Sequence, residues 1–179
     1  AFVTKLWNAA RFALMNLADY DASARAGEAS LYDRWIRHRM DVAIAEAHGA
    51  LDEFRFNDAA QTLYHFVWGE LCDWYIELAK LAFQGGDEEP RRAAQSTLVA
   101  VLRGALTALH PVMPFVTDEI AASLPDADGR FLMEGRYPER GAPLDAESAR
   151  EMDTLVDVVT RIRQVRGELE LPQSTLVGV

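Results

Sequence analysis

The side chains best suited to contacting a polyanion lie near the start of the chain. Lys5, Asn8 and Arg11 are spaced three residues apart, so on a helix they share one face. Lysine and arginine donate to phosphate oxygens, and asparagine pairs with base edges. The same spacing also fits a solvated face whose asparagine bonds to a neighbouring loop. The stripe therefore leaves two interpretations open, a polyanion contact and an ordinary solvated surface.

The residue types used in catalysis and metal binding show no productive spacing. The four histidines are placed so that no two imidazoles share a helix face. The single cysteine, Cys72, lies on an apolar helix face and is interpreted as a small buried hydrophobic residue. The Gly85-Gly86 pair lacks the Lys-Ser/Thr of a phosphate-binding loop. We therefore expect no catalytic residue, no metal site and no cofactor site in this chain.

Composition indicates a folded chain with one core. The chain has 179 residues, of which 50% are hydrophobic and 26% charged, which is enough apolar content to bury a core. No apolar run approaches the roughly 20 residues that span a bilayer, and the N-terminal residues do not follow the order of a signal peptide. We expect a soluble, cytoplasmic protein without membrane contact. Both ends interrupt secondary-structure patterns, so we expect the chain to be a piece of something larger.

The charge distribution weakens the case for nucleic-acid binding without excluding it. The formal net charge is −10, whereas a basic face normally supplies most of the affinity for nucleic acid. The acidity is concentrated in residues 57–149, which carry 7 basic and 15 acidic side chains. Of the basic residues 16 are arginine and 2 are lysine. Arginine suits phosphates and base faces, although a genome-wide preference for arginine explains the same count.

Apolar periodicity predicts three helices in the first half of the chain, at about 2–17, 31–53 and 57–83. Ser30 and Asp33 form a capping-box pattern at the start of the second helix. Asn57 is the expected N-cap of the third. The tract Asp19–Ser30 has no apolar stripe and is expected to be a loop.

The second half predicts a fourth helix from about Pro90, ended by the run His110-Pro111-Val112-Met113-Pro114. Next we expect a short helix at about 116–124 and a loop at 125–144 with an extended piece at 130–133. A last helix follows at about 145–169. An apolar repeat runs along that last helix, and residues 175–179 look like the start of a strand. The expected fold is all-α, a bundle of five to six helices over residues 1–170. Residues 171–179 are expected to be the truncated start of a following segment.

Four motifs, taken in order, resemble the anticodon-binding domain of class I aminoacyl-tRNA synthetases of the valine–isoleucine–leucine group. They are KLWNAARF at 5–12, FVWGELCDWYIELAK at 66–80, LHPVMPFVTDEI at 109–120 and VTRIRQVR at 159–166. The second is most similar to the valine-specific branch. The chain departs from the family pattern at Asp118, where glutamate is usual, and at Ala121-Ala122, where an aromatic often follows. The His-x-Gly-His and Lys-Met-Ser-Lys-Ser motifs of the family's ATP site are absent.

The resemblance implies a recognition role. The implied partners are the anticodon stem-loop of valine tRNA and the remaining domains of a monomeric parent enzyme, which would use ATP and magnesium outside this segment. Asn8 and Arg11, on the stripe with Lys5, are implied for base-edge or phosphate contacts, and Tyr20 for stacking on an unpaired base. The last helix offers three arginines for phosphates, of which at most two can face one strand: Arg161, Arg163 and Arg166. A weaker alternative strip on the second helix consists of Arg34, Arg37 and His38.

Two other interpretations remain. An isoleucine- or leucine-type synthetase would keep the tRNA role with another amino acid. A helical protein-interaction module without RNA binding would account for the acidity and for the broad apolar helix faces.

Overall fold

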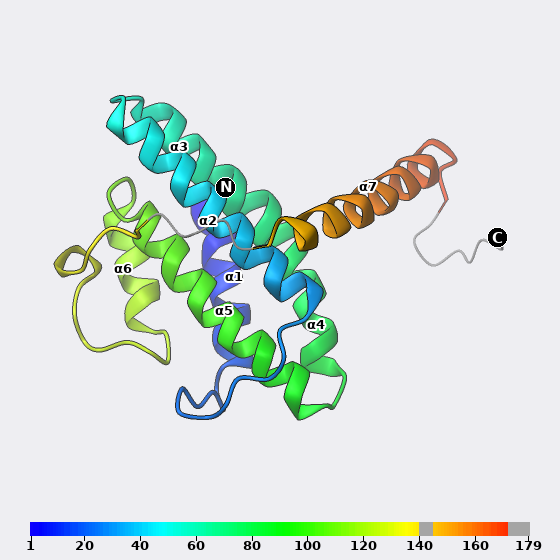
Figure 1. Cartoon of the computed structure of the whole chain (residues 1–179), viewed down its shortest axis with the longest axis horizontal. Coiled ribbons are helices and arrows are strands. Elements are labelled where there is room, and N and C mark those ends of the chain that lie inside the picture. Colours follow the sequence, from blue (N-terminus) through cyan, green and yellow to red (C-terminus); the bar gives the residue numbers. More distant parts are fainter. Residues whose placement is uncertain (140–144, 172–179) are drawn as a thin grey trace.

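The computed structural model describes residues 1–139 and 145–171, and within them the fold is helical, as predicted (Figure 1). The elements in chain order are α1 (Phe2–Asn16), α2 (Leu31–Asp52), α3 (Phe56–His65), the π-helical η1 (Phe66–Tyr75), α4 (Ile76–Gln84), α5 (Glu88–Leu109), α6 (Pro114–Ala122), the 3-10 helix η2 (Leu132–Glu134) and α7 (Ala146–Glu168). Because α3, η1 and α4 follow one another without a break, they form the single long helix expected at 57–83. The strand expected at 175–179 lies outside the described residues.

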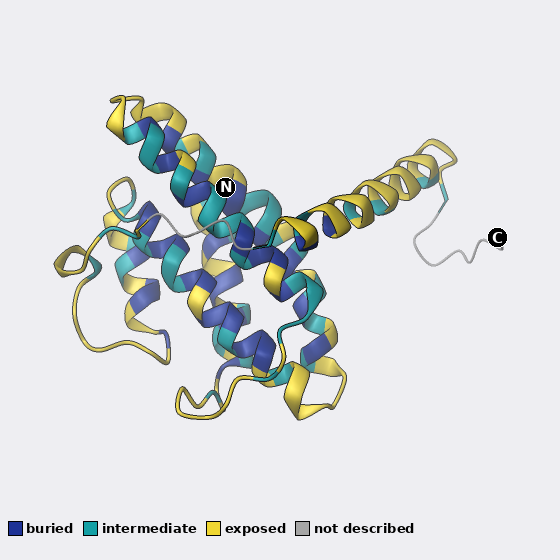
Figure 2. Ribbon diagram, viewed as in Figure 1, coloured by how far each residue is buried: buried dark blue, intermediate teal, exposed yellow. Residues whose placement is uncertain are grey.

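Helix α5 is the most deeply buried element of the bundle. Leu98, Leu102 and Leu106 are fully buried and recur every four residues, so they form one apolar row along the helix. Helices α1, α2, α4 and α6 pack around α5, which gives the buried band in Figure 2. The core is thus built from helix faces alone.

A buried carboxylate determines where α2 begins. Asp33 is 1% exposed, and its Oδ2 accepts hydrogen bonds from the backbone N–H of Ser30 at 3.0 Å and from the Ser30 hydroxyl at 2.6 Å. The backbone N–H of Asp33 donates back to Ser30 Oγ at 3.2 Å, which confirms the predicted capping box. The hydroxyl of Tyr75, itself fully buried, donates to Asp33 Oδ1 at 2.8 Å. This bond joins the start of α2 to η1.

Two local predictions are wrong. Asn57 is not the N-cap of α3, because the helix begins at Phe56 after a turn in which Phe54 adopts a left-handed φ of 60°. The extended piece expected at 130–133 is present only at Phe131, because Leu132 and Met133 belong to the 3-10 helix η2, where the backbone N–H of Leu132 donates to Asp118 Oδ1 at 2.8 Å.

The proline-rich break is confirmed. Helix α5 ends at Leu109, and α6 begins at Pro114, which occupies the first helical turn, where its missing N–H costs nothing. The backbone N–H groups of Val112 and Met113 both donate to Leu109 O at 3.0 Å. These bonds hold the turn between the two helices.

Helix α7 packs against the core through Ala149, Met152 and Val156, and most of the rest of the helix projects from the bundle (Figures 1 and 2), although Arg163 still lies over the Trp74 ring of η1. Met152 is 1% exposed, but Leu155, Ile162 and Val165 are between 43% and 54% exposed. The apolar repeat of this helix is therefore buried only at its start. Within the described ranges no helix is long and apolar enough to cross a membrane.

The Tyr75–Asp33 bond yields a test of the core. We expect Tyr75→Phe to lower the free energy of unfolding by about 1–3 kcal/mol, because it leaves a buried carboxylate oxygen without its donor. Urea unfolding measures the change. Tyr137→Phe is the matched control, since that half-buried hydroxyl makes no hydrogen bond within the described residues. Equal stability of the two variants would contradict the role given to Asp33.

Candidate nucleic-acid interface

Of the polar stripe predicted on α1, one side chain holds the helix against η1 and two remain available to a ligand. The ammonium of Lys5 bonds to Asp73 Oδ1 at 2.5 Å and lies 3.9 Å from the ring centroid of Trp68, so it links α1 to η1. Asn8 and Arg11 are exposed, and within the described part of the chain neither makes a side-chain hydrogen bond or an ion pair. Of the three, Asn8 and Arg11 are the ones available to a ligand.

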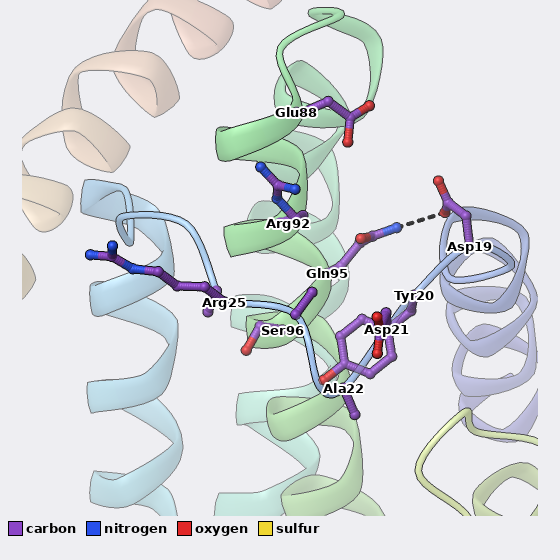
Figure 3. Close-up of a pocket in the computed structure, with 11 residues that line it drawn as sticks. Asp19, Tyr20, Asp21, Ala22, Arg25, Glu88, Arg92, Gln95 and Ser96 are labelled. Atoms are coloured by element: carbon purple, nitrogen blue, oxygen red, sulfur yellow. Dashed lines mark hydrogen bonds between the residues drawn. The ribbon is translucent and has the colours of Figure 1, made fainter.

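Tyr20 lines a polar pocket of about 320 Å³ between the loop after α1 and the first half of α5 (Figure 3). The ring is half-buried and lies beside Ser96 and Ala22, as Figure 3 shows. Arg92 and Gln95 project from α5 into the same pocket, and Arg25 comes from the loop. An aromatic face beside hydrogen-bonding groups is an arrangement that suits an unpaired base.

The wall of this pocket is held by bonds between α5 and the end of α1. The guanidinium of Arg91 bonds to both carboxylate oxygens of Asp19, at 2.9 and 3.0 Å. The amide of Gln95 donates to Asn16 O at 2.9 Å and to Asp19 Oδ1 at 2.8 Å. The Arg91 hydrogen bond holds the pKa of Asp19 below its ordinary value of 3.8. Its negative charge is thus matched by a neighbouring cation.

Two arginines give the pocket its uncommitted positive charge. In the described ranges Arg25 and Arg92 form no ion pair, and both are exposed. The Asp21 carboxylate is engaged by the hydroxyl and backbone N–H of Ser23, at 2.6 and 2.8 Å, and these bonds lower its pKa. Two guanidiniums at the rim can pair with phosphates, although Glu88, whose carboxylate forms no ion pair within the described residues, lines the same pocket.

The α7 arginines lie far from this pocket, on the projecting part of the helix (Figure 1). Arg161 is paired with Asp157 at 3.0 Å one turn earlier. The guanidinium of Arg163 lies 5.3 Å from the ring centroid of Trp74. Arg163 and Arg166 line one hollow of about 520 Å³ near the end of α7. The structure therefore brings Arg163 and Arg166 together and leaves Arg161 outside that hollow.

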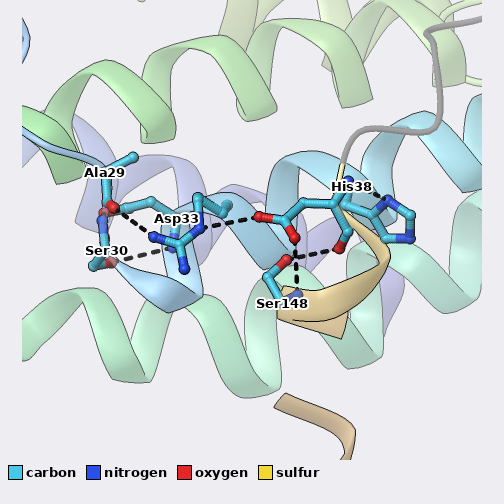
Figure 4. Close-up of polar contacts among 7 residues, drawn as sticks. Ala29, Ser30, Asp33, His38 and Ser148 are labelled. Atoms are coloured by element: carbon cyan, nitrogen blue, oxygen red, sulfur yellow. Dashed lines mark hydrogen bonds and ion pairs between the residues drawn. The ribbon is translucent and has the colours of Figure 1, made fainter. Parts of the chain in front are cut away.

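The alternative strip on α2 is used for packing. Arg34 bonds to Asp145 Oδ2 at 3.0 Å, and the backbone N–H of Asp145 donates to the buried His38 Nδ1 at 3.3 Å (Figure 4). The guanidinium of Arg37 donates to the buried hydroxyl of Thr97 at 2.9 and 3.1 Å. The contacts of Asp145 hold the start of α7 against α2, and the contact of Thr97 holds α5 against α2. This strip is therefore not a free surface for a ligand.

Other reactive groups offer no site. Burial raises the pKa of the Cys72 thiol to about 11, so it is protonated at neutral pH. Among the described residues no group of three or more His, Cys, Asp and Glu side chains could hold a metal ion.

The sequence patterns did not indicate Arg25, Arg92, Gln95 and Ser96 as partners of Tyr20. The three on α5 share one face by their spacing, which is a weak signal on an ordinary helix. Only the approach of the loop to α5 brings them beside the tyrosine. The pocket is therefore a product of tertiary packing.

The chain is similar to known proteins over nearly its whole length. The family model described as "Anticodon-binding domain of tRNA ligase" matches residues 33–179. Among curated relatives, the "Valine--tRNA ligase" of Geobacter sulfurreducens is 45% identical over 97% of this chain and 20% of the relative. That of Latilactobacillus sakei is 40% identical over 99% of this chain and 20% of the relative. The chain spans about a fifth of the length of these relatives.

The Arg91–Asp19 contact yields a prediction about acid pH. Because the pKa of Asp19 is lowered in the folded chain, its carboxylate stabilises the fold above the unfolded-state pKa. That contribution is lost as the pH falls through the folded-state pKa. We expect Arg91→Gln to raise the pKa of Asp19 toward 3.8, as measured by NMR titration of the carboxyl carbon. Arg92→Gln, which removes a neighbouring guanidinium that does not contact Asp19, is the control. An unchanged Asp19 titration in Arg91→Gln would refute the assigned cause.

Proposed function

The chain belongs to the family of anticodon-binding domains of tRNA ligases, and we propose from this premise that it recognises the anticodon stem-loop of valine tRNA within a valine–tRNA ligase. The names of the relatives support the choice of valine. The pocket at Tyr20 is the observation that carries the RNA contact, since it combines an aromatic ring, polar side chains and two unpaired arginines.

The proposed recognition uses unpaired bases of the anticodon loop. Such bases are read by stacking on aromatic rings and by hydrogen bonds to their edges. Tyr20 supplies the ring, and Gln95 and Ser96 supply polar groups on the same pocket wall. Arg25 and Arg92 contact the adjoining phosphates, because arginine binds phosphate oxygens with a planar fork.

Helix α1 extends this surface along the stem-loop. Asn8 and Arg11 lie on the helix that leads directly into the loop carrying Tyr20. A helix has 3.6 residues per turn and rises about 1.5 Å per residue, so Arg11 stands about one and a half turns from the end of α1, Asn16, and within reach of a neighbouring nucleotide. Arg163 and Arg166 form a separate phosphate contact on α7, with the Arg163 guanidinium positioned by the Trp74 ring.

In the parent protein this domain has the role of positioning the bound tRNA. By holding the anticodon end, the bundle places the acceptor end of the tRNA at a catalytic centre outside these residues, where valine is attached at the expense of ATP. We assign ATP and magnesium to that other part, because the described side chains offer no metal-binding cluster. We further propose that the parent acts in the cytoplasm as a monomer.

The binding surface is tested by titrating a fluorescent valine anticodon stem-loop. We expect Tyr20→Leu to weaken binding by about 1–3 kcal/mol, the range for losing one base–aromatic stack. Tyr20→Phe keeps the ring and is expected to bind as the wild type does. Since leucine retains the packing of this half-buried position, equal affinity of the leucine variant would contradict stacking on Tyr20.

Arginine contacts are tested by the salt dependence of the same titration. We expect Arg11→Ala to weaken binding by about 1–3 kcal/mol if it contacts a base, and Arg92→Ala to reduce the slope of log K against log salt by roughly 0.7 if it contacts a phosphate. Arg136→Ala removes an exposed arginine that lies beside the second half of α5, outside the Tyr20 pocket, and is the control. Affinity that does not respond to salt would contradict these phosphate contacts, and a wild-type chain that does not bind the stem-loop would favour a protein-interaction module instead.

A further inference from the structure

Gln95 is buried in the wall of the Tyr20 pocket, and only half of its amide is used. The side chain is 3% exposed, and its Nε2 donates to Asn16 O at 2.9 Å and to Asp19 Oδ1 at 2.8 Å. An amide nitrogen carries two N–H groups, so both are committed. Across the part of the chain that the structure describes, no group donates to Gln95 Oε1. A buried acceptor without a donor is unfavourable, so this oxygen points to a donor supplied by a ligand.

The two acceptors fix the orientation of this amide. A flip of the amide would set its carbonyl oxygen against Asn16 O and Asp19 Oδ1, which are acceptors themselves. In Figure 3 the amide nitrogen points toward Asp19 and the oxygen points away from it. Asp19 is held in turn by Arg91, which bonds to both carboxylate oxygens. Gln95 therefore presents an acceptor to the pocket and no donor.

The loop opposite Gln95 is packed closely onto α5. The backbone of Gly27 lies so near the start of α5 that a Cβ atom at this position would collide with Glu89 O. The hydroxyl of Ser30 holds the end of the same loop on Asp33. The pocket of about 320 Å³ that Tyr20 and Gln95 both line is thus formed by the fold itself. A base that stacks on the Tyr20 ring can direct its edge at the α5 wall.

From this geometry we infer that Gln95 determines which bases the pocket accepts: its carbonyl oxygen accepts a hydrogen bond from the exocyclic amino group of an unpaired adenine or cytosine. The inference rests on the proposed function. Adenine carries this amino group at N6 and cytosine at N4, whereas guanine carries a carbonyl oxygen at O6 and uracil at O4. A carbonyl oxygen of the base would meet the Gln95 carbonyl acceptor to acceptor. The pocket therefore selects the two amino-bearing bases against the other two.

The carboxylates of the pocket act in the same direction. Three of them line it: Asp19, Asp21 and Glu88. An exocyclic amino group carries positive partial charge, so these carboxylates attract it and repel a carbonyl oxygen. Arg25 and Arg92 could serve a carbonyl oxygen, but both are exposed at the rim, whereas Gln95 is buried in the wall. At the wall, both the hydrogen bond and the local charge favour an amino group.

The test changes single groups of the RNA and follows binding to the full-length protein. The probes are fluorescent valine anticodon stem-loops in which one loop adenine or cytosine at a time is replaced. Purine and 2-pyrimidinone lack the amino group, and hypoxanthine and uracil carry a carbonyl oxygen in its place. Each probe is titrated against the wild type and against Gln95→Met, which keeps the length of the side chain and lacks the amide. Arg91→Gln is the matched control, because it loosens the same wall and keeps the Gln95 carbonyl.

We expect one loop position at which removal of the amino group weakens binding to the wild type by about tenfold, equivalent to 1.4 kcal/mol. The carbonyl analogue at that position is expected to bind more weakly still. Arg91→Gln is expected to keep this preference, whereas Gln95→Met binds the intact and the amino-free loop equally because the acceptor is gone. The wild-type titrations need no protein substitution, so they test the preference even if a variant is misfolded.

The contrary outcomes are distinct. Wild-type affinity that no amino removal changes would overturn the role of Gln95 and leave anticodon binding standing. A loss of the same size in Gln95→Met would assign the amino group to another acceptor and would also overturn it. Failure of the wild type to bind any of the stem-loops would overturn the proposed function and this inference with it.

Discussion

A carboxylate buried in an apolar core must accept hydrogen bonds at both of its oxygens, because an unpaired buried charge costs several kcal/mol. Asp33 meets this requirement with three donors, the backbone N–H and hydroxyl of Ser30 and the hydroxyl of Tyr75. The same Tyr75 hydroxyl lies 3.3 Å from Ala94 O on α5. Three segments far apart in sequence are thereby held at one point: the end of the 17–30 loop, the π-helical η1 and the first half of α5. Since the loop that carries Tyr20 is held by α5 at Asp19 and by Asp33 at Ser30, the geometry of the Tyr20 pocket depends on this point.

The bundle separates two surfaces of opposite character. Around Tyr20 the side chains are polar and two arginines are unpaired within the described residues. At the other end of α1 a groove is lined mostly by apolar side chains, together with Asn57 and Gln61. The net charge of −10 does not exclude RNA recognition, because Arg25 and Arg92 supply positive charge locally at a pocket that is also lined by Asp19, Asp21 and Glu88.

Local signals predicted most of the fold, because helix starts and stops depend on neighbours in sequence. The Ser30–Asp33 capping box and the Pro114 start of α6 are such signals. What depends on distant partners could not be predicted. Lys5 looked like part of a free stripe until Asp73, 68 residues away, was found to bind it. Tyr20 was predicted from a resemblance, but its pocket partners on α5 follow from packing alone. Likewise, nothing in the α7 repeat reveals that Leu155, Ile162 and Val165 are exposed while Met152 is buried.

The central claim is that this bundle reads an anticodon. It is tested most directly by titrating the protein with the valine stem-loop and with a stem-loop that differs only in the anticodon bases. The account predicts that the valine loop binds more tightly by about 1–3 kcal/mol per contacted base that is replaced, with both affinities falling as salt rises. Equal affinity for the two loops would show that the bundle contacts only the RNA backbone and would contradict base recognition at the Tyr20 pocket.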